Sequence, residues 1–207
     1  MAADFACSGG GYRRYDAFCA YVDFGRYSLE YAEVGMTLVS RETDKLLDHY
    51  AALIRKWNPA INLIAPQSLP FLEERHIRDS RQLSEVSQTA TENWADLGSG
   101  GGLPGLVHAI MRPDLAVTLV ESDQRKATFL RTVARELALG NVKVLSERIE
   151  KLDQLDVANV SARALAPLPL LMSYVSRHLR ADGTAWLMKG KIGRPKWKRR
   201  VKCGILT

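Results

Sequence analysis

The sequence predicts an α/β fold in which a mostly parallel sheet is flanked by helices. Two observations predict it. From residue 93 onward, short apolar and β-branched stretches alternate with stretches of helical periodicity, and a cluster of glycines follows the first apolar stretch. Such alternation is typical of β-α-β units, whose right-handed crossovers set strands parallel to one another. The 207 residues are enough for one such domain with a small appendage.

A helical segment precedes the alternating part. Apolar residues recur there at helical spacing and predict one amphipathic helix that ends before Pro59: Leu46, Leu47, Tyr50, Leu53, Ile54 and Trp57. A second helical stretch begins at Ser68, which acidic residues follow at 73 and 74. Its other members are Phe71, Leu72, Arg75, His76 and Asp79.

The alternating part predicts five strands and three helices. The expected strands are 94–100 (running into the glycine turn), 116–122, 142–148, 157–165 and 184–190, and the expected helices are 103–111, 124–139 and 168–179. Pro104 falls in the first turn of its helix, where a missing N–H costs nothing. Gly140 and Asn141 close the second helix.

Four parts are expected along the chain: a poorly ordered extension (1–35), an N-terminal helical segment (36–92), an α/β core (93–190) and a basic, atypical tail (191–207). Met36 is a candidate for the biological start, because the helical periodicity begins just after it.

The net charge of +6 comes from the tail. The chain holds 29 Lys and Arg against 23 Asp and Glu, but residues 191–207 hold seven of these bases and no acid. Residues 36–190 hold 19 bases and 18 acids. Net charge therefore gives no argument that the core binds a polyanion.

The composition also excludes several protein classes. No apolar run approaches the roughly 20 residues of a membrane span, and the first residues lack the pattern of a secretory signal. Cys7, Cys19 and Cys203 form no CxxC pair and lie at no zinc-binding spacing from a histidine. We expect a reduced cytoplasmic protein without a metal site.

The sharpest local pattern is the glycine turn that runs from Asp96 to Gly105. Glycines after a strand let the backbone turn tightly and approach a ligand, and the next helix presents free N–H groups. Glu121 ends the second strand, where a carboxylate can accept the hydroxyls of a ribose. The spacing of Gly100, Gly102 and Gly105 also fits a nicotinamide or flavin nucleotide, but Asp96 beside the turn favours S-adenosylmethionine, because it attracts an ammonium group and repels a pyrophosphate.

A longer series of motifs resembles one family. The residues that carry it are Lys56-Trp57-Asn58 with Asn62-Leu63, Arg75-His76 with Asp79-Ser80, the turn with Leu103-Pro104-Gly105, Lys126 with Phe129-Leu130, Arg148 with Glu150, Ser161-Ala162-Arg163-Ala164, and Lys189-Gly190. Their order and spacing resemble the bacterial small-subunit ribosomal RNA guanine-N7 methyltransferase family (RsmG, glucose-inhibited division protein B).

The resemblance implies a Rossmann-like class I S-adenosylmethionine-dependent methyltransferase with N-terminal helices, and we expect this chain to have a truncated C-terminal edge. It implies methylation of N7 of a specific guanine in 16S ribosomal RNA, in the decoding region. The implied partner is 16S ribosomal RNA in the small ribosomal subunit or in an assembly intermediate. The enzyme is expected to be a monomer and to bind no membrane. Guanine N7 carries a free lone pair, so the reaction needs no general base.

The resemblance also implies roles for individual residues. The implied cofactor-binding residues are Gly98, Gly100, Gly102, Leu103, Glu121, Ile149, Glu150 and Arg163. Glu121 takes the ribose, and Ile149 and Glu150 flank the adenine. Arg163 lies where cofactor and guanine meet, and with His76 and Asp79 it forms the implied catalytic group. The alternatives are a surface salt bridge for Arg163 and a structural hydrogen bond between His76 and Asp79.

The chain departs from the family after Lys189-Gly190. Family members continue there with a helix and a final pair of strands, for which residues 191–207 are too short. We therefore expect the sheet to lack its antiparallel edge, which leaves an outer strand open to solvent. Two alternatives to the implied activity remain: a methyltransferase with another substrate, and an inactive truncated binding module.

Overall fold

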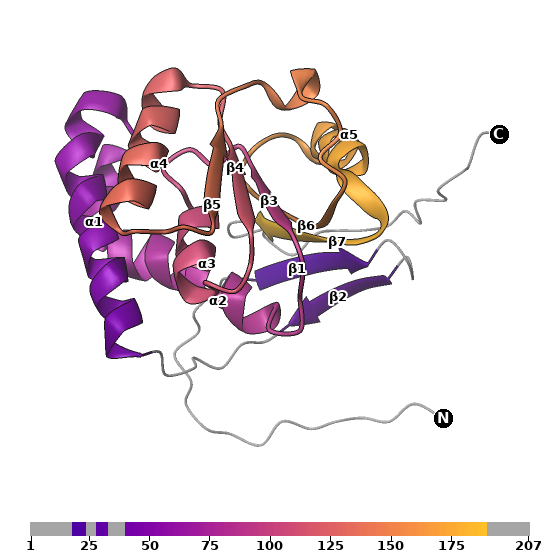
Figure 1. The fold of residues 1–207 in the computed structure, drawn as a ribbon, viewed down its shortest axis with the longest axis horizontal. Coiled ribbons are helices and arrows are strands. Elements are labelled where there is room, and N and C mark those ends of the chain that lie inside the picture. The colour runs from indigo at the N-terminus through magenta and orange to yellow at the C-terminus, as the bar shows by residue number, and fades with distance from the viewer. Residues whose placement is uncertain (1–17, 24–27, 33–39, 190–207) are drawn as a thin grey trace.

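The computed structural model describes residues 18–23, 28–32 and 40–189, and Figure 1 shows them as a sheet with helices on both faces. The strands of the described residues are β1 (Phe18–Asp23), β2 (Ser28–Ala32), β3 (Trp94–Leu97), β4 (Val117–Val120), β5 (Val142–Leu145), β6 (Val157–Arg163) and β7 (Leu179–Lys189). The α-helices are α1 (Arg41–Ile61), α2 (Arg78–Val86), α3 (Gly105–Met111), α4 (Gln124–Glu136) and α5 (Leu168–His178). Shorter helical turns are η1 (Pro66–Phe71), η2 (Glu73–Ile77) and η3 (Ile149–Lys151).

The strands form one sheet in the order β2-β1-β7-β6-β3-β4-β5. The last five of these run parallel, with β3 in the middle, where Trp94 pairs with Val117 of β4 and with Asn159 of β6. This arrangement confirms the predicted fold class. The carboxyl ends of the five parallel strands share one edge, which is where ligands bind in open α/β sheets.

The two faces of the sheet carry separate apolar clusters. Helices α1 to α4 pack on one face, where Trp94, Val117 and Leu119 meet apolar residues such as Phe129 of α4. Helix α5 and turn η3 cover the other face, which Ala95, Leu97, Val120 and Val160 supply from the strands. Alternate residues of a strand point to opposite faces, so one short strand supplies both clusters.

Helix α1 is longer than its sequence predicts. Ser40 caps its start, where the side chain accepts a hydrogen bond from the backbone N–H of Thr43 at 3.1 Å. The prediction that the helix ends before Pro59 is wrong, because α1 continues to Ile61 and Pro59 lies in its last turn. Proline removes a single helical hydrogen bond there, and the helix ends soon afterwards at Asn62, which adopts φ 47°.

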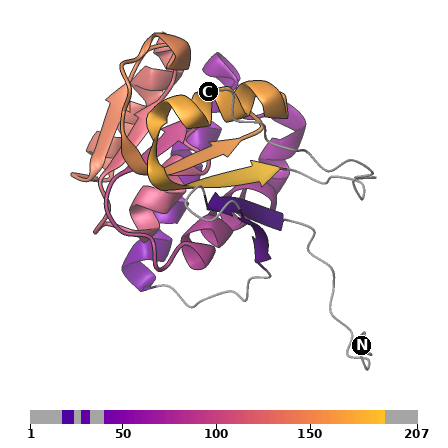
Figure 2. The same cartoon turned by 90° about the vertical axis from the view of Figure 1, so that its right-hand side faces the viewer.

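An antiparallel edge is present, contrary to our expectation, and residues before α1 form it. Strand β1 pairs antiparallel with β7, from Phe18 opposite Lys189 to Asp23 opposite Thr184, and β2 pairs antiparallel with β1. Figure 2 shows β1 alongside β7. We expect residues 1–35 to form a poorly ordered extension, yet two stretches of it belong to the sheet. Strand pairing uses backbone groups, so an extended segment can cover an open edge without a clear side-chain pattern.

The remaining expectations concern the second helical stretch, a membrane span and the basic tail. The second predicted helical stretch is present as η1, η2 and α2. No helix in the described ranges is long and apolar enough to cross a membrane. The basic tail of residues 191–207 lies outside the described residues, as do residues 1–17, 24–27 and 33–39.

Candidate active site

The glycine turn follows β3 at the carboxyl edge of the sheet. Gly98, Gly100 and Gly102 have φ values of 70°, 56° and 89°, which place all three in the left-handed region that favours glycine. The N–H groups of Gly98 and Ser99 donate to the carbonyl oxygen of Val120 at 2.9 and 3.0 Å. The turn is thereby attached to β4, the strand that Glu121 directly follows.

These glycines differ in what surrounds them. A Cβ atom at Gly102 would lie 2.4 Å from Cδ1 and 3.0 Å from Cβ of Leu106, and one at Gly98 would lie 2.3 Å from Cδ1 of Leu165. At Gly100 the nearest atom would be 3.9 Å away. The protein itself fills the space at Gly98 and Gly102, whereas the space at Gly100 is open to a ligand.

Glu121 holds the open part of the turn. Its Oε2 accepts a hydrogen bond from the N–H of Gly100 at 2.7 Å, and its Oε1 accepts one from the N–H of Asp123 at 2.8 Å. Each carboxylate oxygen has a second acceptor site, so Glu121 can still bind two hydroxyls of a ribose. The predicted ribose ligand therefore lies directly beside the predicted cofactor turn.

Asp96 is buried beneath the turn. Its Oδ1 accepts a hydrogen bond from the hydroxyl of Ser161 at 2.7 Å, and Ser161 in turn accepts one from Nε1 of Trp94 at 2.9 Å. Burial raises the pKa of Asp96 to about 6, while the Ser161 hydrogen bond and the charge of Arg163 act in the opposite direction. The carboxylate is mostly ionised at neutral pH and supplies negative charge under the turn.

Arg163 and His76 meet at the end of β6. Nη2 of Arg163 lies 2.5 Å from Nδ1 of His76, although 87 positions separate them. A guanidinium group only donates, so Nδ1 accepts and the ring hydrogen is on Nε2. Burial, followed by the charges of Arg163 and Arg75, lowers the pKa of His76 to about 4, so the ring is neutral at pH 7. Its Nε2 is buried and has no partner among the described residues.

Asp79 completes this group. Burial raises the pKa of Asp79, and the positive charge of Arg163 opposes the change. Burial lowers the pKa of Arg163, against the opposing influence of Asp79, Tyr50 and Asp96. Arg163 forms no ion pair within 4.0 Å in the described part of the chain, so a surface salt bridge does not account for it. His76 bonds Arg163 and not Asp79.

The predicted adenine residues lie in η3, just after β5. Ile149 is buried in the apolar cluster under α5, and its carbonyl oxygen lies 2.9 Å from Nε2 of His178. Glu150 is exposed and lies 3.7 Å from Arg148 across an ion pair. Leu103 is buried in the glycine turn. His178, which the sequence analysis leaves without a role, thus supports the turn that carries Ile149.

Tyr50 was not among the residues predicted for the site. Its hydroxyl donates a hydrogen bond to the carbonyl oxygen of Gly101 at 2.6 Å. Helical periodicity places Tyr50 among core residues, and it is indeed fully buried. The available signal was chemical, because a buried tyrosine hydroxyl requires a hydrogen-bond partner.

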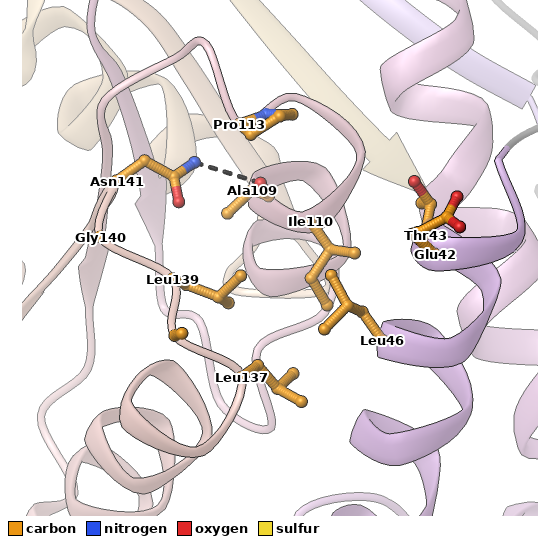
Figure 3. Close-up of a pocket in the computed structure, with 11 residues that line it drawn as sticks. Glu42, Thr43, Leu46, Ala109, Ile110, Pro113, Leu137, Leu139, Gly140 and Asn141 are labelled. Carbon is orange, nitrogen blue, oxygen red and sulfur yellow. Dashed lines mark hydrogen bonds between the residues drawn. The ribbon is translucent and has the colours of Figure 1, made fainter.

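Two measurable cavities lie away from this group. One of about 590 Å³ is lined by Leu46 of α1, Ile110 of α3 and residues 137–141, which precede β5 and so lie near the amino ends of the strands (Figure 3). Another of about 350 Å³ lies between α1 and α2, beside Asp44 and Arg81. Neither includes the glycine turn, and chemistry rather than cavity size identifies the site. The described residues contain no cluster of three or more possible metal ligands.

A glycine turn over Asp96, a carboxylate at the end of β4 and a parallel sheet with helices on both faces define a Rossmann-like methyltransferase that uses S-adenosylmethionine. A solved structure supports the fold alone: coclaurine N-methyltransferase bound to N-methylheliamine and SAH, with a TM-score of 0.52 and 17% identity over 72% of this chain and 52% of that one. The chain belongs to the GidB family, described as rRNA small subunit methyltransferase G, whose model matches residues 43–203.

Named relatives agree with this assignment. The chain is 65% identical over 153 residues to ribosomal RNA small subunit methyltransferase G of Paracoccus denitrificans. The matched residues cover 74% of this chain and 79% of that protein. It is 46% identical over 168 residues to the protein of the same name from Ruegeria pomeroyi, with 79% of each covered. The family match includes residues 191–203, so most of the tail that the sequence analysis sets apart falls within it.

Proposed function

We propose that this enzyme transfers the methyl group of S-adenosylmethionine to N7 of a guanine in 16S ribosomal RNA, with Arg163, His76 and Asp79 at the reacting centre. The observation that carries the proposal is the contact between Arg163 and His76 at 2.5 Å, beside the carboxyl edge that holds the glycine turn. Membership of the GidB family supports both the reaction and the substrate.

The residues at this edge fit the chemistry of the cofactor. Gly100 leaves open space for close approach, and Glu121 offers acceptors for the ribose hydroxyls. Gly98, Gly102 and Leu103 shape the turn, Ile149 and Glu150 flank the adenine, and Arg163 completes the set. Asp96 attracts the ammonium group of the amino-acid end. When bound, S-adenosylmethionine supplies a methyl group that its sulfonium activates for attack by a lone pair.

The catalytic group positions the guanine. N7 attacks without losing a proton, so no residue has to act as a general base, and a neutral His76 is consistent with this. Arg163 donates hydrogen bonds only, and the acceptor edge of guanine (N7 and O6) offers it O6. His76 fixes the direction of the guanidinium group, and Asp79 balances its charge. Catalysis then rests on holding N7 in line with the methyl group.

The setting of the reaction belongs to the same proposal. The substrate is 16S ribosomal RNA in the small subunit or in an assembly intermediate, the enzyme acts as a monomer, and it works in the cytoplasm. The target guanine has to leave its stack to reach the edge of the sheet. The extent of methylation of naked RNA, mature subunits and subunit precursors distinguishes these substrates.

Replacing Arg163 tests the proposal. We expect Arg163→Ala to lower transfer of tritiated methyl groups to 16S ribosomal RNA about a hundredfold or more, as for other donors that act on the reacting group. Arg131→Ala, on the exposed side of α4, is the matched control and should keep full activity. Full methylation by the Arg163 variant would refute its role. Cofactor binding by a wild-type chain that methylates no ribosomal RNA would instead favour the inactive binding module or another substrate.

A further inference from the structure

Tyr50 connects the N-terminal helical segment to the glycine turn. Its side chain is fully buried, and its hydroxyl donates to the carbonyl oxygen of Gly101 at 2.6 Å across 51 positions of sequence. Burial raises the pKa of Tyr50 well above its usual value. The hydroxyl therefore keeps its proton and remains a donor throughout the physiological range.

The accepting carbonyl belongs to the peptide between Gly101 and Gly102. The N–H of that same peptide donates to the carbonyl oxygen of Ser99 at 2.7 Å, so both ends of the peptide unit are bonded. A peptide between two glycines meets few steric limits on rotation. Tyr50 thus holds the carbonyl end of this peptide and Ser99 its N–H end, while Glu121 holds the N–H of the preceding Gly100 at 2.7 Å.

The contact belongs to a packed junction. A Cβ atom at Gly101 would lie 3.3 Å from Cβ of Leu63, which follows α1 and is buried. Arg163 and Asp96 lie close enough to Tyr50 for their charges to act on its hydroxyl. The turn is therefore held from two sides: Glu121 holds it from the sheet, and Tyr50 holds it from α1.

We infer that Tyr50 is a positioning residue, which fixes the Gly101–Gly102 peptide and thereby holds the turn in the conformation that binds S-adenosylmethionine. The inference rests on the proposed function and deepens it, because it makes α1 part of the cofactor site. Tyr50 acts through Gly101 and touches neither the methyl group nor the guanine. Loss of its hydroxyl should therefore weaken cofactor binding and leave the chemical step nearly unchanged at saturation.

The test is Tyr50→Phe, which removes one oxygen atom. We expect the Kd for S-adenosylhomocysteine, measured by calorimetry, and the KM for S-adenosylmethionine to rise about tenfold, with kcat within about twofold. The matched control is Tyr174→Phe in α5, a partly buried tyrosine whose hydroxyl has no hydrogen-bond partner within the described ranges. It should bind the cofactor as the wild type does. A urea titration of each variant shows that the protein measured is folded.

A measurement without cofactor separates this inference from the proposed function. Amide hydrogen exchange at Gly102 in the free protein should become faster in Tyr50→Phe and stay unchanged in Tyr174→Phe. Unchanged exchange, an unchanged Kd, or a fall in kcat at constant Kd would each overturn the positioning role. Should the wild type bind no cofactor, the proposed function fails, and the exchange at Gly102 still decides whether Tyr50 fixes the turn.

Discussion

Alanine at Gly102 should mainly lower stability, whereas alanine at Gly100 should mainly lower cofactor affinity, although the two positions share the same turn. Both have positive φ, which costs a residue with a Cβ about 1–2 kcal/mol. At Gly102 the new methyl group also meets Leu106, down to its Cβ at 3.0 Å, so rotation of the leucine cannot remove the clash. Overpacking of this kind costs about 1–3 kcal/mol more.

We therefore expect Gly102→Ala to lower the free energy of unfolding by about 2–5 kcal/mol, against about 1–2 kcal/mol for Gly100→Ala. The nearest atom to a Cβ at Gly100 is 3.9 Å away, so the methyl group there fills ligand space instead. Gly100→Ala should stay folded and lose most of its affinity for S-adenosylhomocysteine. Urea denaturation gives the first quantity and calorimetry the second.

Two results would contradict this reasoning. Equal losses of stability in the two variants would mean that Leu106 does not set the limit at Gly102. Wild-type affinity in Gly100→Ala would mean that the cofactor does not approach the open side of the turn. Gly140→Ala is a control for glycine replacement outside the site, because a Cβ there meets nothing within 4 Å.

Three further outcomes are expected. Ser161→Ala removes the donor at 2.7 Å from Asp96, and should lower the free energy of unfolding by about 1–3 kcal/mol and raise the pKa of Asp96 further, as read by NMR titration. His108 is fully buried, and burial is the main cause that lowers its pKa to about 3, below its unfolded value of 6.5. Between these two values the unfolded state binds one proton more than the folded state. The free energy of unfolding should therefore fall by about 1.4 kcal/mol per pH unit as pH falls from 6.5 towards 3. A His108→Leu variant with an unchanged slope would refute that assignment. Arg163→Lys keeps the charge but not the fork that reaches His76, and should lose transfer activity nearly as fully as alanine in a methylation assay.

Much of the fold follows from periodicity. Alternating apolar and helical stretches were enough to predict the parallel sheet, because each strand and helix from β3 to β7 has apolar residues at the spacing of its own secondary structure. The pairing of β1 with β7 was not predictable in that way. It depends on backbone groups of an exposed edge, which leave no trace in side-chain spacing. The end of α1 was mispredicted because Pro59 lies in the last turn of the helix, where a proline removes only one backbone hydrogen bond.

In the candidate site, too, some residues could be predicted from local sequence patterns and others could not. Asp96, Glu121 and Arg163 could be placed together because each lies at or next to the carboxyl end of a parallel strand, and such ends meet at one edge. His76 could not be placed by periodicity, since it belongs to a π-helical turn 87 positions from Arg163; only the resemblance to a family pointed to it. Tyr50 escaped notice because a helical stripe records burial and not the direction of a hydroxyl. The roles of these residues remain predictions.

The pairing of β1 with β7 has a consequence for how the chain folds during synthesis. Phe18 emerges from the ribosome long before its partner Lys189. The parallel strands can assemble first, but β7 keeps an unpaired edge until β1, a segment far away in sequence, reaches it. Contacts between such distant residues are slow to form, so we expect the pairing of β1 with β7 to be the last step. Until then the unpaired edge of β7 should be the part of the protein most prone to associate with other chains.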